Sequence, residues 1–156
     1  MHMVELNVAS VTTLTHHYVK GMASRRSGRV LQVASVAAYL PSPFYASYSA
    51  TKSYVLSFSV ALNRELAGTG VSVTTLCPGF TATEFHRVAA HEKPRWMDLV
   101  TMTADDVAEI GIRSMMHGRA VVTTGFVNKL VAVIVKLVPR GWATRGAEMS
   151  MRVGAP

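Results

Sequence analysis

The sequence predicts an α/β fold in which a short parallel sheet is covered by helices. Three short runs rich in β-branched residues have the composition of buried strands, at 30–35, 71–78 and 120–124. Segments with helical spacing of apolar residues lie before, between and after these runs. Strands that alternate with helices are typical of a parallel sheet, because each parallel connection needs a crossover of helical length.

Four helices are predicted, over 4–24, 47–67, 104–117 and 126–138. The first ends in the basic, glycine-containing stretch "SRRSGR". The third begins at a capping box, because Thr103 precedes Asp106 by three residues at the start of the apolar period. The helices therefore have sequence-encoded boundaries as well as apolar faces.

The 156 residues form one domain with an expected ordered core over 4–138. Residues 80–99 show no clean period and are expected to form a long loop with short helical pieces. Residues 141–156 are expected to form a loose tail.

Composition and charge exclude several classes of protein. The net charge is +7, but the basic residues are scattered and no aromatic residues interleave with them, so nucleic-acid binding is not expected. Cys77 is the only cysteine, which favours a reducing compartment such as the cytoplasm. The longest apolar run, 126–139, is too short to span a membrane and carries two lysines. The histidines lack metal-ligand spacing, so no metal site is predicted.

Tyr48 and Lys52 are the first candidates for chemistry. Four residues apart on a predicted helix, they are neighbours on one face. A lysine ammonium beside a phenol favours the phenolate and lowers a pKa that starts near ~10. A tyrosine of this kind can exchange a proton with a substrate hydroxyl or carbonyl near neutral pH.

Two further features converge on the same edge of the predicted sheet. Ser35 ends one strand, and Cys77-Pro78-Gly79 ends the next. In open parallel sheets, ligands bind beyond the carboxyl ends of the strands. Ser35, Pro78 and the helix that bears Tyr48 are therefore expected to face one crevice.

The stretch from Leu6 to Phe85 resembles the C-terminal half of the classical short-chain dehydrogenase/reductase family. The matching motifs are "ELNVAS", "GRVLQVAS", "YSATK" and "CPGFTAT". They place the family's asparagine at Asn7, its serine at Ser35, its Tyr-x3-Lys pair at Tyr48 and Lys52, and its Pro-Gly-x3-Thr segment at 78–83. The resemblance implies a Rossmann-like doubly wound sheet, here with about three strands.

The resemblance also implies a role for each catalytic residue. Tyr48 is expected to be the general acid/base, and Lys52 to lower its pKa and hold the nicotinamide ribose. Ser35 is expected to hydrogen-bond the substrate oxygen. Asn7 is expected to hold a water in a proton relay to Lys52. The implied activity is hydride transfer between NAD or NADP and a carbonyl or alcohol substrate.

The cofactor and the lid follow from the same resemblance. Pro78, Gly79 and Thr83 are expected along the nicotinamide end of the cofactor, with the Thr83 hydroxyl near the carboxamide. The 80–99 segment is expected to be a substrate lid, a common role for loops over an active site.

A glycine-rich phosphate-binding turn is missing from this sequence. The eleven glycines form neither G-x-G-x-x-G nor the family's looser T-G-x3-G-x-G. The chain is therefore expected to be a member truncated at its N-terminus, with impaired cofactor binding. The strand 30–35 is then expected to have an open edge, and open edges promote association. A homo-oligomer is therefore predicted, and the resemblance implies that its contact runs through the helices that bear Asn7 and Tyr48.

Two other functions remain open at this point. Ser35 with Tyr48 and Lys52 also resembles the equipment of a serine-dependent esterase, although "VASVA" is not a G-x-S-x-G elbow. The other alternative is a non-catalytic oligomerising remnant, in which Tyr48 and Lys52 are relics.

Overall fold

The structure is a computed structural model that describes residues 2–82 and 101–152. Its main sheet has three strands: β1 (Gly28–Val33), β2 (Val71–Cys77) and β5 (Val121–Thr123). The strands lie in the order β1-β2-β5, and both pairs are parallel. The predicted α/β fold with a parallel sheet is confirmed, and β2 is its central strand.

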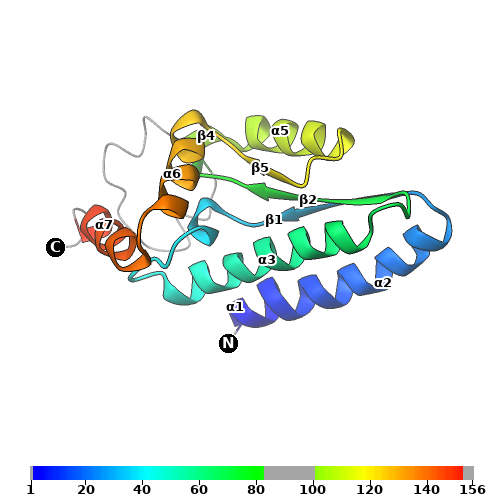
Figure 1. Cartoon of the computed structure of the whole chain (residues 1–156), viewed down its shortest axis with the longest axis horizontal. Helices are drawn as coiled ribbons and strands as arrows, with labels where there is room; N and C mark the ends of the chain where they lie inside the picture. Colours follow the sequence, from blue (N-terminus) through cyan, green and yellow to red (C-terminus); the bar gives the residue numbers. More distant parts are fainter. Residues whose placement is uncertain (1, 83–100, 153–156) are drawn as a thin grey trace.

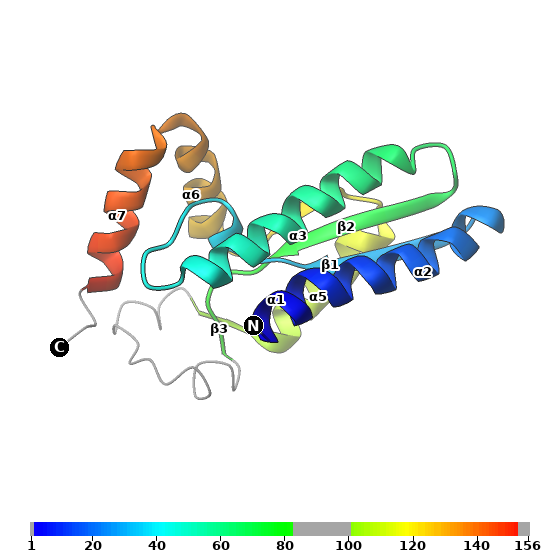
Figure 2. The same ribbon diagram turned by 90° about the horizontal axis from the view of Figure 1, so that it is seen from below.

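Helices cover both faces of this sheet (Figure 1). One face carries α2 (Val11–Ser24) and α3 (Ala46–Glu65), and the other carries α5 (Ala104–Met116). Figure 2 shows α3 and the N-terminal helical segment running side by side along the same face. Thr103 caps α5 as predicted, because its hydroxyl accepts a hydrogen bond from the Asp106 N–H at 3.1 Å.

Two apolar layers hold the helices to the sheet. Val19 and Leu66 of the helical layer pack against Val71 and Val73 of β2. On the opposite face, Val107 of α5 packs against strand residues. Val73 is fully buried, as expected for the middle of a central strand covered on both sides.

The first helix is less regular than predicted. It consists of α1 (His2–Val4), a π-helical turn (Glu5–Ser10) and α2. Hydroxyl groups compete for backbone carbonyls in this turn: Ser10 Oγ donates to the Leu6 carbonyl, and Thr12 Oγ1 donates to the Val8 carbonyl at 2.7 Å. Such back-bonding distorts helices, and π-helical turns are common at functional sites.

The region after β2 contains a second, smaller sheet that the sequence analysis did not predict. β3 (Thr81–Ala82) pairs in parallel with β4 (Met102–Thr103). The Met102 N–H also donates to the Phe80 carbonyl at 3.0 Å. The expected lid covers 80–99, and most of it lies outside the described residues.

The C-terminal region corrects one expectation. A loose tail was expected over 141–156, but α7 (Arg140–Arg152) occupies most of it. The Pro139 carbonyl accepts hydrogen bonds from the N–H groups of Trp142 and Ala143, which starts the helix. It follows α6 (Phe126–Leu137), and both helices lie at the end of the molecule where the strands have their carboxyl ends (Figure 1).

Candidate active site

The side chain of Lys52 joins the carboxyl end of β1 to the helix that carries Tyr48. Its Nζ donates a hydrogen bond to the Val33 carbonyl at 3.0 Å. The same Nζ lies 5.7 Å from the centre of the Tyr48 ring, which is within the range of a cation–π contact. Burial lowers the pKa of Lys52, and the nearby Cys77 thiol opposes that change. The predicted pairing of Tyr48 and Lys52 on one helical face is therefore present in the structure.

Asn7 reaches the same helix through a threonine. The Asn7 Nδ2 donates to Thr51 Oγ1 at 3.2 Å. The Thr51 hydroxyl in turn donates to the Tyr48 carbonyl at 2.9 Å. The π-helical turn thus presents Asn7 to the turn of α3 that holds both Tyr48 and Lys52. Sequence reasoning missed Thr51, because nothing distinguishes it from the small residues around it.

Ser35 lies just beyond the end of β1. The Ala34 N–H still donates to the Leu76 carbonyl, so the chain stays beside β2 up to this point. Ser35 then begins a 3-10 turn (Val36–Ala38), and its Oγ accepts a hydrogen bond from the Ala37 N–H at 3.1 Å. Ser35 was predicted at the end of the strand itself and is instead the cap of the following turn.

Pro78 and Gly79 share this edge of the sheet, as predicted. The Val36 N–H donates to the Pro78 carbonyl at 2.9 Å, which joins the segments after β1 and β2. Parallel strands end at the same edge, so the backbones that follow them meet there.

A contact with α6 fixes the position of Gly79. A Cβ atom on Gly79 would lie 2.0 Å from the Asn128 Nδ2, so the amide fills the space that a side chain would need. The Asn128 Nδ2 donates to the Thr124 carbonyl at 2.8 Å, and the Thr124 hydroxyl accepts a long 3.4 Å hydrogen bond from the Gly79 N–H. Sequence reasoning missed Asn128. Its only signal was an isolated amide within an apolar run.

Tyr39 and Cys77 form a polar layer beneath this edge. The hydroxyl groups of Tyr39 and Thr123 share a hydrogen bond of 2.7 Å. Burial, together with the Cys77 thiol, raises the pKa of Tyr39 to about 12. Burial also raises the pKa of Cys77, and Tyr39 and Lys52 oppose that change. Cys77 is fully buried, so this layer is structural support and not a reactive surface.

Thr83, which the resemblance placed near the carboxamide, lies outside the described residues. In the part of the chain that the structure covers, no three histidine, cysteine or acidic side chains are grouped so as to hold a metal ion. No helix within 2–82 or 101–152 has the length and apolar character needed to cross a bilayer.

The family profile described as short chain dehydrogenase matches residues 1–94, which is more than half of the chain. The chain belongs to this family. Rat 17-beta-hydroxysteroid dehydrogenase type 3 is 30% identical over 138 residues, which cover 88% of this chain and 42% of the rat protein. The chain thus spans less than half the length of this relative.

Solved structures of the family share the fold. A structure of a 7beta-hydroxysteroid dehydrogenase has a TM-score of 0.78 at 24% identity, over 93% of this chain and 57% of that chain. A gluconate 5-dehydrogenase from Burkholderia cenocepacia, in complex with NADP and tartrate, has a TM-score of 0.68 at 21% identity. That match covers 78% of this chain and 52% of the other.

The donor groups at this edge suit the nicotinamide end of a dinucleotide. An ammonium has three N–H donors, and the Val33 carbonyl accepts one of those of Lys52. The other two suit the paired hydroxyl groups of a ribose. The segment that follows β2, with Pro78 and Gly79, lies at the same edge, where the Val36 N–H donates to the Pro78 carbonyl. These residues therefore fit that part of the cofactor.

Proposed function

We propose that this chain carries the acid/base machinery of an NAD(P)-dependent oxidoreductase that interconverts a carbonyl and an alcohol. The observation that supports this most is the Lys52 ammonium, which lies beside the Tyr48 ring and at the carboxyl end of β1. Family membership makes an oxidoreductase the expected class, and the contacts of Lys52 and Asn7 support the roles proposed below.

In the reducing direction, Tyr48 donates its phenolic proton to the substrate oxygen as the carbonyl becomes an alcohol. When bound, the nicotinamide supplies the hydride in this direction and accepts it in the reverse one. The positive charge of Lys52 stabilises the phenolate that Tyr48 leaves behind. Ser35 holds the substrate oxygen. Asn7, through Thr51, holds the Tyr48 turn of α3 in place and orders the water that returns the proton.

Lys52 and Tyr48 would hold the nicotinamide ribose, and Pro78, Gly79 and Thr83 would line the nicotinamide. The 156-residue sequence contains no glycine-rich phosphate-binding turn. We therefore propose that this chain by itself binds the cofactor weakly, and that binding and turnover need a high cofactor concentration.

The chain is also proposed to self-associate. Leu6, Leu14 and Tyr18 on the N-terminal helices and Val60 on α3 are exposed apolar side chains. These helices lie side by side in Figure 2. Equilibrium sedimentation of the Leu14→Glu variant against the parent chain tests this surface, since a charge there should shift any dimer towards monomer. We propose a cytoplasmic location, which suits the free thiol of Cys77.

The test of the activity is Tyr48→Phe, which removes only the ionisable hydroxyl group. Turnover of a ketone panel with NADPH or NADH should fall by roughly 10²–10⁴-fold, and the circular dichroism spectrum should not change. Saturation-transfer NMR with each cofactor measures binding separately from turnover. Full turnover by Tyr48→Phe would refute the assignment.

The relatives named above are dehydrogenases and lend no support to the esterase alternative. One experiment would decide in favour of the esterase. Covalent labelling of Ser35 by a serine-reactive phosphonate, lost in Ser35→Ala, would replace the oxidoreductase proposal. If the parent chain binds no nicotinamide cofactor and turns over no substrate, the residues are relics and the non-catalytic alternative holds.

A further inference from the structure

The outward side of α6 is an apolar surface that no other element within 2–82 or 101–152 covers. Seven of its side chains are exposed: Phe126, Val127, Leu130, Val131, Val133, Ile134 and Leu137. Phe126 is 82% exposed and Leu137 is 80% exposed, at opposite ends of the helix. Only its inward side is buried, through Asn128 and Ala132. An apolar surface of this extent marks a docking site on a folded protein.

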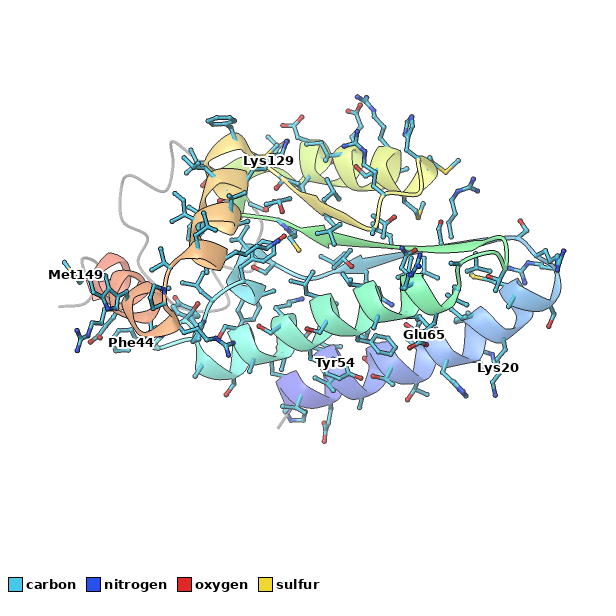
Figure 3. The ribbon with its side chains drawn as sticks, in the orientation of Figure 1. Lys20, Phe44, Tyr54, Glu65, Lys129 and Met149 are labelled. Atoms are coloured by element: carbon cyan, nitrogen blue, oxygen red, sulfur yellow. The ribbon has the colours of Figure 1, made fainter. Side chains whose placement is uncertain are left out.

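Basic residues border this surface. Lys129 and Lys136 are exposed on α6, and Arg140 and Arg145 are exposed on α7. Figure 3 shows Met149 of α7 at one end of the molecule and Lys20 at the other, with Lys129 of α6 between them in this view. In the sequence, the single acidic residue between 126 and 149 is Glu148. This end of the chain therefore combines apolar side chains with positive charge.

The position of the lysines on the helix decides what the surface can bind. At 100° per residue, Lys129 and Lys136 lie on one flank of α6, between the exposed apolar side and the buried side that holds Asn128. Long lysine side chains in that position reach the headgroup level while the apolar side chains enter the acyl boundary. On α7, Trp142 is 74% exposed, and tryptophan is enriched at membrane interfaces.

We propose that α6, together with α7, docks flat on an anionic lipid surface. The apolar side of α6 would enter the boundary between headgroups and acyl chains, as interfacial helices do. Lys129, Lys136, Arg140 and Arg145 would contact the negative headgroups. The helix has 12 residues and lies parallel to the surface, because it is too short to cross the bilayer.

A second copy of the chain suits this surface less well. In a symmetric contact with antiparallel copies of α6, the lysine flank of one copy would lie beside the lysine flank of the other. Like charges that face each other across a contact cost free energy. An anionic bilayer presents the opposite charge along the whole flank. The complementary sign therefore favours lipid as the occupant.

The experiment is co-sedimentation of the full chain with sucrose-loaded vesicles. One set of vesicles contains phosphatidylcholine alone. The other contains about 30% phosphatidylglycerol in phosphatidylcholine, which gives the vesicle surface a strong negative charge. Each lysine near an anionic surface changes the partition coefficient by roughly 5-fold, so Lys129→Gln with Lys136→Gln should weaken binding by about 25-fold. The matched control, Lys20→Gln with Arg64→Gln, removes two exposed charges from α2 and α3 and should bind like the parent chain.

A second pair of variants tests the apolar side. Phe126→Ser with Leu137→Ser should lower the partition coefficient by about 10-fold or more, because both side chains would lose their burial in lipid. Both are exposed, so circular dichroism should show an unchanged fold. Binding that requires anionic lipid and depends on both pairs supports the proposal.

Three outcomes would overturn it. One is the absence of binding to anionic vesicles. Another is equal loss in the Lys20/Arg64 control, which would indicate non-specific attraction of a basic protein. The third is a vesicle-independent dimer that becomes a monomer in the Phe126/Leu137 variant, which would assign the surface to a second copy. None of these readouts depends on turnover.

Discussion

The ammonium of Lys52 donates a hydrogen bond to the carbonyl oxygen of Val33, so a side chain of α3 satisfies the last carbonyl group of β1. The bond holds the charge 5.7 Å from the centre of the Tyr48 ring. It leaves other N–H donors of the ammonium available. One residue therefore joins sheet, helix and candidate acid.

Replacing Lys52 with Met should abolish turnover and preserve the fold, because the methionine chain keeps most of the packing volume. Burial lowers the pKa of Lys52 in the folded chain, so the unfolded chain binds the proton more tightly. The free energy of unfolding of the parent chain should therefore rise with pH from the lowered pKa towards 10.5, relative to Lys52→Met. Urea unfolding of both proteins at several pH values measures the difference. Parallel pH profiles would contradict the burial of the charge.

Removing the amide of Asn7 should loosen the turn of α3 that bears Tyr48. Asn7→Ala is expected to lower the free energy of unfolding by about 1 kcal/mol, the usual net value of one hydrogen bond. Thr51→Val should cost more, because it also removes the bond to the Tyr48 carbonyl, and Thr51→Ser, which keeps the hydroxyl, should cost less. The two losses should not add in the double variant, because both remove the same bond. Strict additivity would show that the contact is not energetically important.

Gly79 should not tolerate even a methyl group. In Gly79→Ala, the new Cβ would meet Asn128 at 2.0 Å, so the amide must leave its bond to the Thr124 carbonyl. Such overpacking is expected to cost about 2 kcal/mol of unfolding free energy. Gly141→Ala is the matched control, since its Cβ meets nothing within 4 Å, and it should be neutral or slightly stabilising.

Asn128→Ala gives the complementary test of that contact. Alone it should destabilise the chain, because it empties the space beside Gly79 and removes the bond to Thr124. Combined with Gly79→Ala it should recover part of the loss, because the methyl group then has room. A double variant that is no better than the sum of the two would contradict the direct contact.

Tyr39 should make the chain sensitive to alkali. The pKa of Tyr39 is about 12 in the folded chain, and its ordinary value is 10.0. Between these two pH values, the folded chain keeps a proton that the unfolded chain releases. The free energy of unfolding should fall as pH rises from 10 to 12, by on the order of 1 kcal/mol after allowance for solvent screening. Tyr39→Phe should remove that part of the slope.

The fold was predictable wherever it depends on the periodic spacing of apolar residues or on the distance in sequence between two residues. The strand runs and the helices between them were enough for the parallel sheet, because strands that alternate with helices favour parallel pairing through helical crossovers. The position of Tyr48 and Lys52 on one face followed from helical geometry. The position of Ser35 and Pro78 at one edge, just after β1 and β2, followed from the rule that the carboxyl ends of parallel strands share an edge.

Features that depend on contacts distant in sequence were not predictable. Asn128 acts through Gly79, and neither residue reveals the other in one sequence. The π-helical turn at Glu5–Ser10 depends on hydroxyl groups that bond to carbonyls within the helix. The helix α7 was missed because Gly141 and Gly146 lower the helix propensity of this segment. The hydrogen bonds that the Pro139 carbonyl accepts at its start are visible only in the structure.

The pairing of the main sheet has a consequence for how the chain folds. Every strand of that sheet meets its neighbour only after a complete helix has intervened, and none of its pairs is a hairpin. Loop closure must therefore precede any backbone pairing in it, which places such a chain among the slower folders. During synthesis, β2 emerges after β1 and α3, so α3 has time to form before the first strand pair. Until β5 arrives, the central strand has one free side, and the nascent chain is most exposed to aggregation in that interval.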